Sequence, residues 1–404
     1  MEQTSYWITN ARLETGYQYE NGNVVGTKTE VFHVRVENGK IAEIVSASTP
    51  IEPNLIKFDA RKLLMLPSFK EMHIHIDKTY YGGPWKAVNP ATSIFDRFAE
   101  ERELLPKLLP TARERAEKML DLFVGFGSTH VRTHCNIDPG VGLKNLEATI
   151  QALESFSDKL SYEVVAFPQH GLLRSDVVEL MSAAMKQGAT LVGGVDPYTV
   201  DENIEKSLHT IFDIAVQSNS GVDVHIHDRG DIGILTMNTL ADFTEQAGLE
   251  GKVTVSHAFG FVGGSEGKVE QLAERFAELG ISITSTVPIG NLIMPIPLLR
   301  EKGVKVGLGT DSLTDHWSPF GIGDNLEKAG RLAELYRYVD ELSLSQALGF
   351  ITDGKTPLNR EGKRVWPAIG DDASMNFVQA TCSAEAVARR ATREAVFFQG
   401  NLVS

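Results

Sequence analysis

The spacing of hydrophobic residues differs between the ends and the middle of the chain. Near both ends, apolar and polar residues alternate in short runs, such as VFHVRVENGKIAEIV at 31–45 and EAVFFQGNLVS at 394–404. This two-residue period is typical of strands with one buried face, and the NGK inside the first run indicates a hairpin. We therefore expect strands over 1–66 and 365–404, and we expect these two ends to form one small β-sandwich domain.

In the middle, over residues 67–364, compact apolar segments alternate with longer helical patterns. Eight such segments occur: LLMLPSFKEMHIHI, STHVRTHC, YEVVAFPQ, ATLVGGVD, VDVHIHD, VTVSHA, ISITSTVP and VKVGLGTDS. Strands that alternate with helices indicate parallel βα units. Eight units fit an α/β protein with a (β/α)8 TIM barrel. An open doubly wound sheet fits less well, because no GxGxxG dinucleotide loop is present.

Histidines and an aspartate stand at the ends of several of these segments, where barrel enzymes carry their chemistry. His73 and His75 are two residues apart, so their side chains leave a strand on the same side. With His225 and Asp311 they offer three imidazoles and one carboxylate. This set suits one divalent metal ion, with zinc as the first expectation and iron or manganese as alternatives.

A divalent ion lowers the pKa of a bound water to about 7, so hydrolysis is the expected chemistry. The water must lose protons and the leaving group must gain one, which requires acid and base groups within hydrogen-bond reach. The catalytic candidates are His257, Asp311, Lys78 and Asp228. An alternative interpretation makes Lys78 a surface cation paired with Asp77, because lysines are usually exposed.

These segments, in this order, resemble the amidohydrolase superfamily and, within it, the cytosine deaminase-like branch. The resemblance spans essentially the whole chain and rests on HIHIDKT, SIFDRFAEERELLP, HVRTH, VVAFPQHGLL, VDVHIHD, VTVSHA and GTDSLTDHWSPFG. It implies a metal-binding barrel with a β-sandwich built from both termini. It also implies that His73, His75, His225 and Asp311 are metal ligands and that His257 polarises the attacking water or the substrate.

Two details of the resemblance concern individual residues. In cytosine deaminase, a glutamate three residues beyond the ligand of the fifth strand shuttles a proton. This chain has Asp228 there, and the shorter acid holds its carboxyl group about one C–C bond further back. The residues matching Lys78, Asp196, His257 and Trp317 are associated with the active site of N-isopropylammelide isopropyl amidohydrolase. Whether Lys78 or Asp228 transfers the proton stays open.

The predicted substrate-binding residues are Gln169, Asp196 and Trp317. Gln169 can hydrogen-bond a ring amide edge or satisfy the backbone at a strand end. Trp317 can stack on a planar heterocycle or pack in the interior. We therefore expect a metal-dependent deaminase or aminohydrolase that releases ammonia or an alkylamine from a cytosine-, isocytosine-, triazine- or pterin-like ring. The alternatives are a cyclic amide or lactone hydrolase with the same metal site, and a non-catalytic scaffold.

The composition and charge of the chain limit the kinds of partner that it can bind. The 404 residues include 39 Lys and Arg against 53 Asp and Glu, a formal net charge of −14. This charge repels phosphate backbones and anionic lipids, so we expect a small heterocyclic substrate, no nucleic acid and no membrane. Cys135 and Cys382 are too few for a disulfide framework or a thiolate metal site. We expect a cytoplasmic protein, and the resemblance implies a homo-oligomer.

Overall fold

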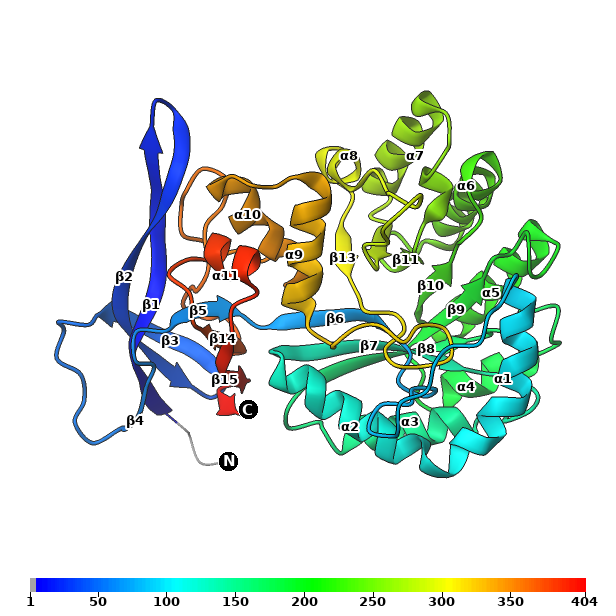
Figure 1. The fold of residues 1–404 in the computed structure, drawn as a ribbon, viewed down its shortest axis with the longest axis horizontal. Coiled ribbons are helices and arrows are strands. Elements are labelled where there is room, and N and C mark those ends of the chain that lie inside the picture. The colour runs from blue at the N-terminus through cyan, green and yellow to red at the C-terminus, as the bar shows by residue number, and fades with distance from the viewer. Residues whose placement is uncertain (1–4) are drawn as a thin grey trace.

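The computed structural model describes residues 5–404 and contains two sheets that lie side by side (Figure 1). One sheet has eight parallel strands, hydrogen-bonded in sequence order. They are β6 (Phe69–Ile74), β7 (Ser128–Asn136), β8 (Ser161–Phe167), β9 (Leu191–Val195), β10 (Gly221–His225), β11 (Val253–Ser256), β12 (Ser282–Ser285) and β13 (Val306–Leu308). Each of the eight predicted segments overlaps one of these strands.

The barrel closes between its first and last strands through the backbone just beyond β6 and β13. The Asp311 N–H donates to the His73 carbonyl oxygen at 2.6 Å, and the His75 N–H donates to the Asp311 carbonyl oxygen at 3.1 Å. Three predicted metal ligands therefore lie next to one another because of the bonds that close the barrel. The predicted (β/α)8 barrel is confirmed.

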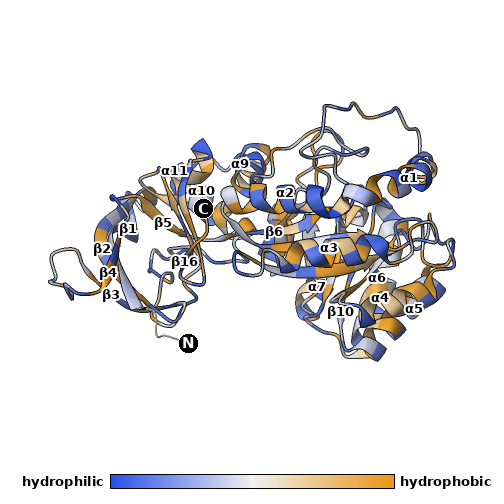
Figure 2. Cartoon of the chain, turned by 90° about the horizontal axis from the view of Figure 1, so that it is seen from below, coloured by the Kyte–Doolittle hydropathy of each residue, from blue (hydrophilic) through white to orange (hydrophobic). Residues whose placement is uncertain are grey.

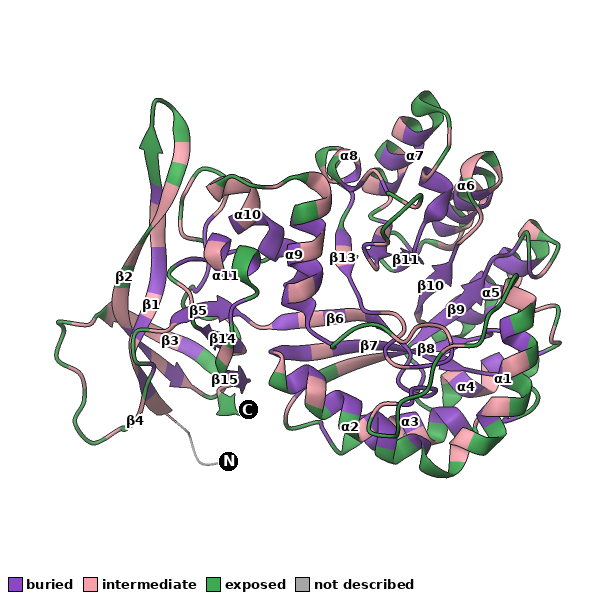
Figure 3. Cartoon of the chain, viewed as in Figure 1, coloured by how far each residue is buried: buried purple, intermediate pink, exposed green. Residues whose placement is uncertain are grey.

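Amphipathic helices cover the barrel. They are α1 (Ile94–Leu108), α2 (Ala112–Gly125), α3 (Lys144–Glu154), α4 (Val178–Lys186), α5 (Ile204–Ser218), α6 (Gly230–Ala247), α7 (Glu266–Glu278), α8 (Ile296–Glu301) and α9 (Asn325–Tyr336). A further helix, α10 (Glu341–Ala347), packs against α9 on the side of the second sheet (Figure 1). In α5, Leu208, Ile211 and Ala215 form a buried stripe, Asn203 caps the start, and Asn219 ends the helix in the left-handed conformation. Hydrophobic and hydrophilic residues share each helix (Figure 2), while the barrel strands are largely buried (Figure 3).

Strands from both ends of the chain form the second, mixed sheet. They are β1 (Ser5–Glu20), β2 (Asn23–Glu37), β3 (Lys40–Ser46), β4 (Ile56–Asp59), β5 (Leu64–Pro67), β14 (Met375–Val378), β15 (Arg393–Phe398) and β16 (Asn401–Leu402). β5 pairs with β14, which joins the two ends. Asn38 and Gly39 both have positive φ between β2 and β3, so the predicted NGK hairpin is confirmed. Ile8, Val34 and Phe397 share one apolar core there.

Two details differ from the predicted elements. The segment LLMLPSFKEMHIHI is not one strand, because it changes sheets after Pro67. The Ser68 N–H donates to Ser374 in the second sheet, and the next N–H, of Phe69, donates to Gly127 beside the barrel. The range 365–404, where strands were expected, also contains a helix, α11 (Ser383–Arg389), which buries Ala386 and Val387. In the part of the chain that the structure describes, no helix is both long and apolar enough to cross a membrane.

Candidate active site

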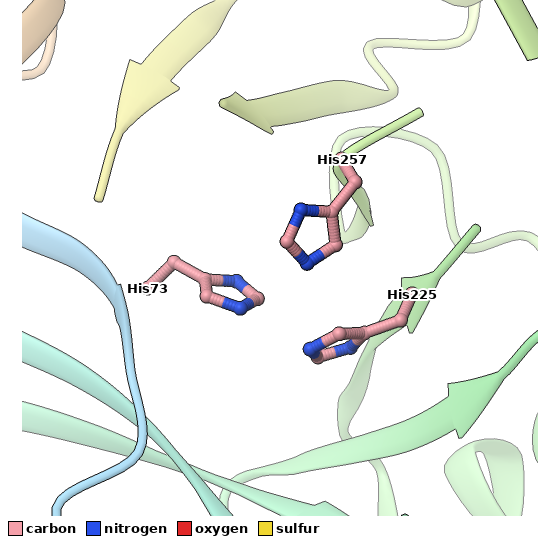
Figure 4. A group of neighbouring side chains, drawn as sticks. All are labelled: His73, His225 and His257. Carbon is pink, nitrogen blue, oxygen red and sulfur yellow. The ribbon is translucent and has the colours of Figure 1, made fainter. Parts of the chain in front are cut away.

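Five predicted site residues meet beyond the carboxyl ends of the barrel strands. Nitrogen atoms of His73, His225 and His257 lie within 4.8 Å of one another, and Figure 4 shows these three rings pointing toward a common space. Ligand atoms of His73, His75 and Asp311 are equally close. The Oδ1 atom of Asp311 lies 3.3 Å from Nε2 of both His73 and His75. His73 belongs to both groups, so the structure brings all four predicted ligands and His257 together.

The chemistry of these side chains fits a divalent ion. His73 Nε2, His257 Nε2 and both ring nitrogens of His225 are buried and have no hydrogen-bond partner within residues 5–404. Leaving buried polar atoms unpaired is costly, and a metal ion is the partner that neutral imidazoles commonly take. This end of the barrel can therefore hold a metal.

The protonation states agree with that role. Burial and, after it, the positive charge of Lys78 lower the pKa of His75 to about 3. Burial also lowers the pKa values of His225 and His257 well below their usual range. Burial alone would raise the pKa of Asp311, but its contacts with the ring nitrogens of His73 and His75 outweigh burial and hold that pKa well below its usual value. Neutral imidazoles beside an ionised carboxylate are the forms that bind a metal.

Hydrogen bonds behind the cluster orient His73. Asp223 is buried, and its carboxylate accepts from Ser256 Oγ at 2.6 Å and from Arg132 Nη1 at 3.0 Å. Because the Ser256 hydroxyl donates to Asp223, its oxygen accepts from His73 Nδ1, which lies 2.8 Å away. The proton on Nδ1 leaves the Nε2 lone pair of His73 free for a metal.

Lys78, Gln169 and Trp317 form a second group at the same end of the barrel. The Lys78 side chain is 1% exposed, and its Nζ donates to Glu101 Oε1 at 3.0 Å and to Gln169 Oε1 at 2.7 Å. The surface interpretation of Lys78 beside Asp77 is therefore wrong. An ammonium only donates, so the Gln169 oxygen faces Lys78 and the amide NH2 remains available to donate elsewhere. Trp317 Nε1 also donates to Glu101 Oε1, at 2.8 Å.

The two remaining acids lie further along the rim. Asp196 is buried, and its carboxylate accepts from the His227 backbone N–H at 2.5 Å and pairs with His227 Nδ1 at 2.8 Å. The centroids of the His227 and His257 rings lie 4.4 Å apart. Asp196 therefore contacts His227, and His227 contacts the histidine cluster. Both Asp228 oxygens accept from Thr199. Burial and then Asp196 raise the pKa of Asp228.

Three predicted site residues have backbone conformations that residues with side chains seldom adopt. The φ angle is 67° at His257, 66° at Asp311 and 36° at Asp196. Such left-handed conformations persist only where the surrounding structure holds them, and they cluster at active sites. Three of the positive-φ residues of this chain are therefore ones that the sequence predicts to take part in chemistry.

Known proteins share this sequence and fold. A sequence profile described as amidohydrolase family matches residues 100–403. The chain belongs to the amidohydrolase family. The uncharacterized protein YahJ of Escherichia coli K12 is 48% identical over 401 residues, which cover 98% of this chain and 87% of YahJ.

Two crystal structures resemble this amidohydrolase closely. N-isopropylammelide isopropylaminohydrolase from Burkholderia multivorans ATCC 17616 has a TM-score of 0.87 and 29% identity, and covers 99% of this chain and 98% of its own. The 5-methylcytosine deaminase of Klebsiella pneumoniae, with 5-fluorocytosine bound, has a TM-score of 0.81 and 25% identity. The match covers 98% of this chain and 97% of the deaminase. The resemblance to the cytosine deaminase-like branch is confirmed, and this amidohydrolase is a hydrolytic enzyme that acts on C–N bonds, not a non-catalytic scaffold.

Two buried residues of the amidohydrolase site that were not predicted from the sequence are His134 and Glu101. The His134 ring lies 4.1 Å from the His73 ring, and neither of its nitrogens has a partner in the described chain. Its signal was its position at the end of the second barrel segment. Glu101 lies on the buried face of α1 with Phe98 and Leu105. An acid at an apolar-face position of a helix was the signal there.

Ser256 gives a test of the bonds behind the cluster. Replacing Ser256 with alanine removes the acceptor of the His73 Nδ1 proton, so we expect metal affinity to fall about 10–100-fold, as is typical for lost outer-shell partners. Competition with a chelator measures the affinity. Ser282→Ala, in the neighbouring strand β12, is the matched control and should keep the affinity of the unmodified protein. An unchanged affinity in Ser256→Ala would show that Ser256 does not orient the ligand.

Proposed function

We propose that this amidohydrolase is a metal-dependent deaminase or aminohydrolase of an amino-substituted N-heterocycle. Its substrate would be a cytosine-, isocytosine-, triazine- or pterin-like ring, and its leaving group ammonia or an alkylamine. One divalent ion, with zinc as the first candidate and iron or manganese as alternatives, would be held by His73, His75, His225 and Asp311. The observation that supports the proposal is that nitrogen atoms of His73, His225 and His257 lie within 4.8 Å of one another and that ligand atoms of His73, His75 and Asp311 do so as well.

The proton transfers fall to groups around that point. When bound, a divalent ion supplies the positive charge that makes a water acidic near neutral pH. His257 has a free Nε2 that lies 3.9 Å from Asp311 Oδ2, so it is placed to accept a proton from the water. Burial keeps the pKa of His257 well below its usual range, so its neutral, proton-accepting form prevails. The same ring can return the proton to the leaving amine.

The neighbouring donors and aromatic rings suit an oxygen-bearing ring. Lys78 and the NH2 of Gln169 both offer hydrogens, so they match carbonyl oxygens or ring nitrogens with free lone pairs. The Trp317 indole lies beside them and provides a flat apolar face. Relatives named for N-isopropylammelide and 5-methylcytosine support this substrate class. Asp196, which acts on His227, and Asp228, which contacts Thr199, would serve the site from its rim.

A product screen tests the proposal. Metal-loaded protein is incubated with cytosine, isocytosine, ammelide, N-alkylammelides and pterins, and released ammonia or alkylamine is measured. We expect release from at least one of these rings and none from His225→Ala prepared identically. If none of these rings releases ammonia or alkylamine and the protein instead opens the rings of cyclic amides or lactones, the cyclic amide or lactone hydrolase replaces the proposal.

A further inference from the structure

Glu101 is a buried carboxylate surrounded by nitrogen atoms from four different segments. Its side chain is 0% exposed. The contacting atoms are Lys78 Nζ at 3.0 Å, His316 Nε2 at 2.8 Å and Trp317 Nε1 at 2.8 Å on Oε1, and His170 Nε2 at 2.9 Å and Asn136 Nδ2 at 3.1 Å on Oε2. These partners lie at the end of β7 or in the segments after β6, β8 and β13, so one side chain from α1 connects the ends of four barrel strands.

Lys78 is the strongest of these partners because both groups are buried and carry full charges. Burial alone would lower the pKa of Lys78, but Glu101, Asp77 and Asp315 raise it above its usual value. Burial alone would raise the pKa of Glu101, but Lys78 and the hydrogen bonds from the histidines hold it well below its usual value. Each ion therefore depends on the other to remain charged.

Glu101 is also the acid that contacts Lys78 directly. The Asp77 carboxylate accepts from the backbone N–H of Asn136 at 2.9 Å. The Asp315 carboxylate accepts from the backbone N–H of Trp317 at 2.7 Å. Both carboxylates thus have other partners, and the direction of the Lys78 ammonium is set by Glu101 together with Gln169.

We propose that Glu101 is a positioning residue that fixes the Lys78 ammonium toward the substrate. Two of the three Lys78 N–H groups point to Glu101 and Gln169, and the third is left to meet an acceptor on the ring. The inference rests on the proposed function, because it assumes that Lys78 contacts the substrate. Packing holds the N-terminal half of α1 next to Lys78 and Trp317. Phe98 of this helix shares one apolar cluster with Phe167, and Trp317 packs against that cluster.

A double-variant cycle tests the inference on kcat/KM. Lys78→Met and Glu101→Gln should each lower kcat/KM about 100-fold, the scale of loss for a misplaced group. The double variant should be within about threefold of Lys78→Met, because Glu101 acts through Lys78. Glu103→Gln, an exposed acid on the same helix, is the matched control and should match the unmodified protein. Equal losses from Glu101→Gln in both backgrounds, or loss of bound metal in this variant, would overturn the inference.

The Tm of thermal unfolding, measured on the same variants, is a second test that needs no substrate. Lys78→Met leaves a buried carboxylate without its counter-charge, so its Tm should fall by about 5 °C, and adding Glu101→Gln should restore at least half of the loss. If the two Tm losses simply add, Glu101 does not fix Lys78 and the inference fails. No amine release from any ring in the substrate screen, together with coupled Tm values, would instead reject the proposed function and the role of Lys78 toward a substrate, while the dependence of Lys78 on Glu101 would stand. If Glu101→Gln does not fold, the double variant, which removes both charges, still supplies the comparison with Lys78→Met.

Discussion

Replacing His225 with alanine is expected to remove bound metal and activity together while the barrel stays folded. His225 ends β10, and both of its ring nitrogens lack a hydrogen-bond partner in the described chain, so no internal hydrogen bond is lost. The ring stacks on Phe167 with centroids 4.1 Å apart, a contact whose loss costs packing but not the fold. Losing a ligand should weaken metal binding by more than the roughly 100-fold of an outer-shell change.

Elemental analysis measures the bound metal of the His225→Ala variant, circular dichroism its fold, and the amine-release assay its activity, all on the same sample. His209→Ala is the matched control, because His209 is an exposed histidine on α5. It should retain metal and activity. A fully active His225→Ala variant with its metal would contradict the ligand assignment.

The second large effect is expected at His257. Replacing His257 with asparagine removes the ring that accepts the proton from water, so activity should fall about 10²–10⁴-fold while the metal stays bound. Activity and metal binding should separate in this variant because the four ligands that hold the ion remain: His73, His75, His225 and Asp311. The same assays distinguish this variant from His225→Ala.

The metal content of His257→Asn decides between two roles. Nitrogen atoms of His257 lie as close to His73 and His225 as ligand atoms do. If the variant loses its metal along with activity, His257 is a ligand and the base must be another group, for which His227 at 4.4 Å between ring centroids is the nearest histidine. Full activity in the variant would exclude His257 from the chemistry altogether.

The barrel and the metal cluster could be predicted because local sequence patterns determine them. Strand ends can be recognised from apolar segments, and side chains two residues apart share a face, which places His73 beside His75. Parallel strands of one barrel bring all their carboxyl ends to one rim, so His225 and Asp311 had to approach them. The four predicted ligands accordingly lie together, although they come from separated parts of the chain.

The surroundings of the cluster depend on contacts that no local pattern specifies. Lys78 gives no sign in the sequence of its partner Glu101, which is 23 residues away on a helix beyond an exposed segment. Asp228 was assigned through resemblance to a glutamate, but the chain after β10 turns its carboxylate to Thr199. Asp196 likewise contacts His227, a residue left without a role. Loop conformation and side-chain direction decided each of these cases.

The central claim is that one divalent ion is held by His73, His75, His225 and Asp311. Anomalous diffraction from a crystal of the metal-loaded protein tests it most directly. We predict a single peak at about 2.0–2.2 Å from one atom of each of the four side chains. A peak among His134, Asp223 and His225, whose ligand atoms also lie within 4.8 Å of one another, would contradict the claim, as would a metal-loaded crystal without any peak at the four ligands.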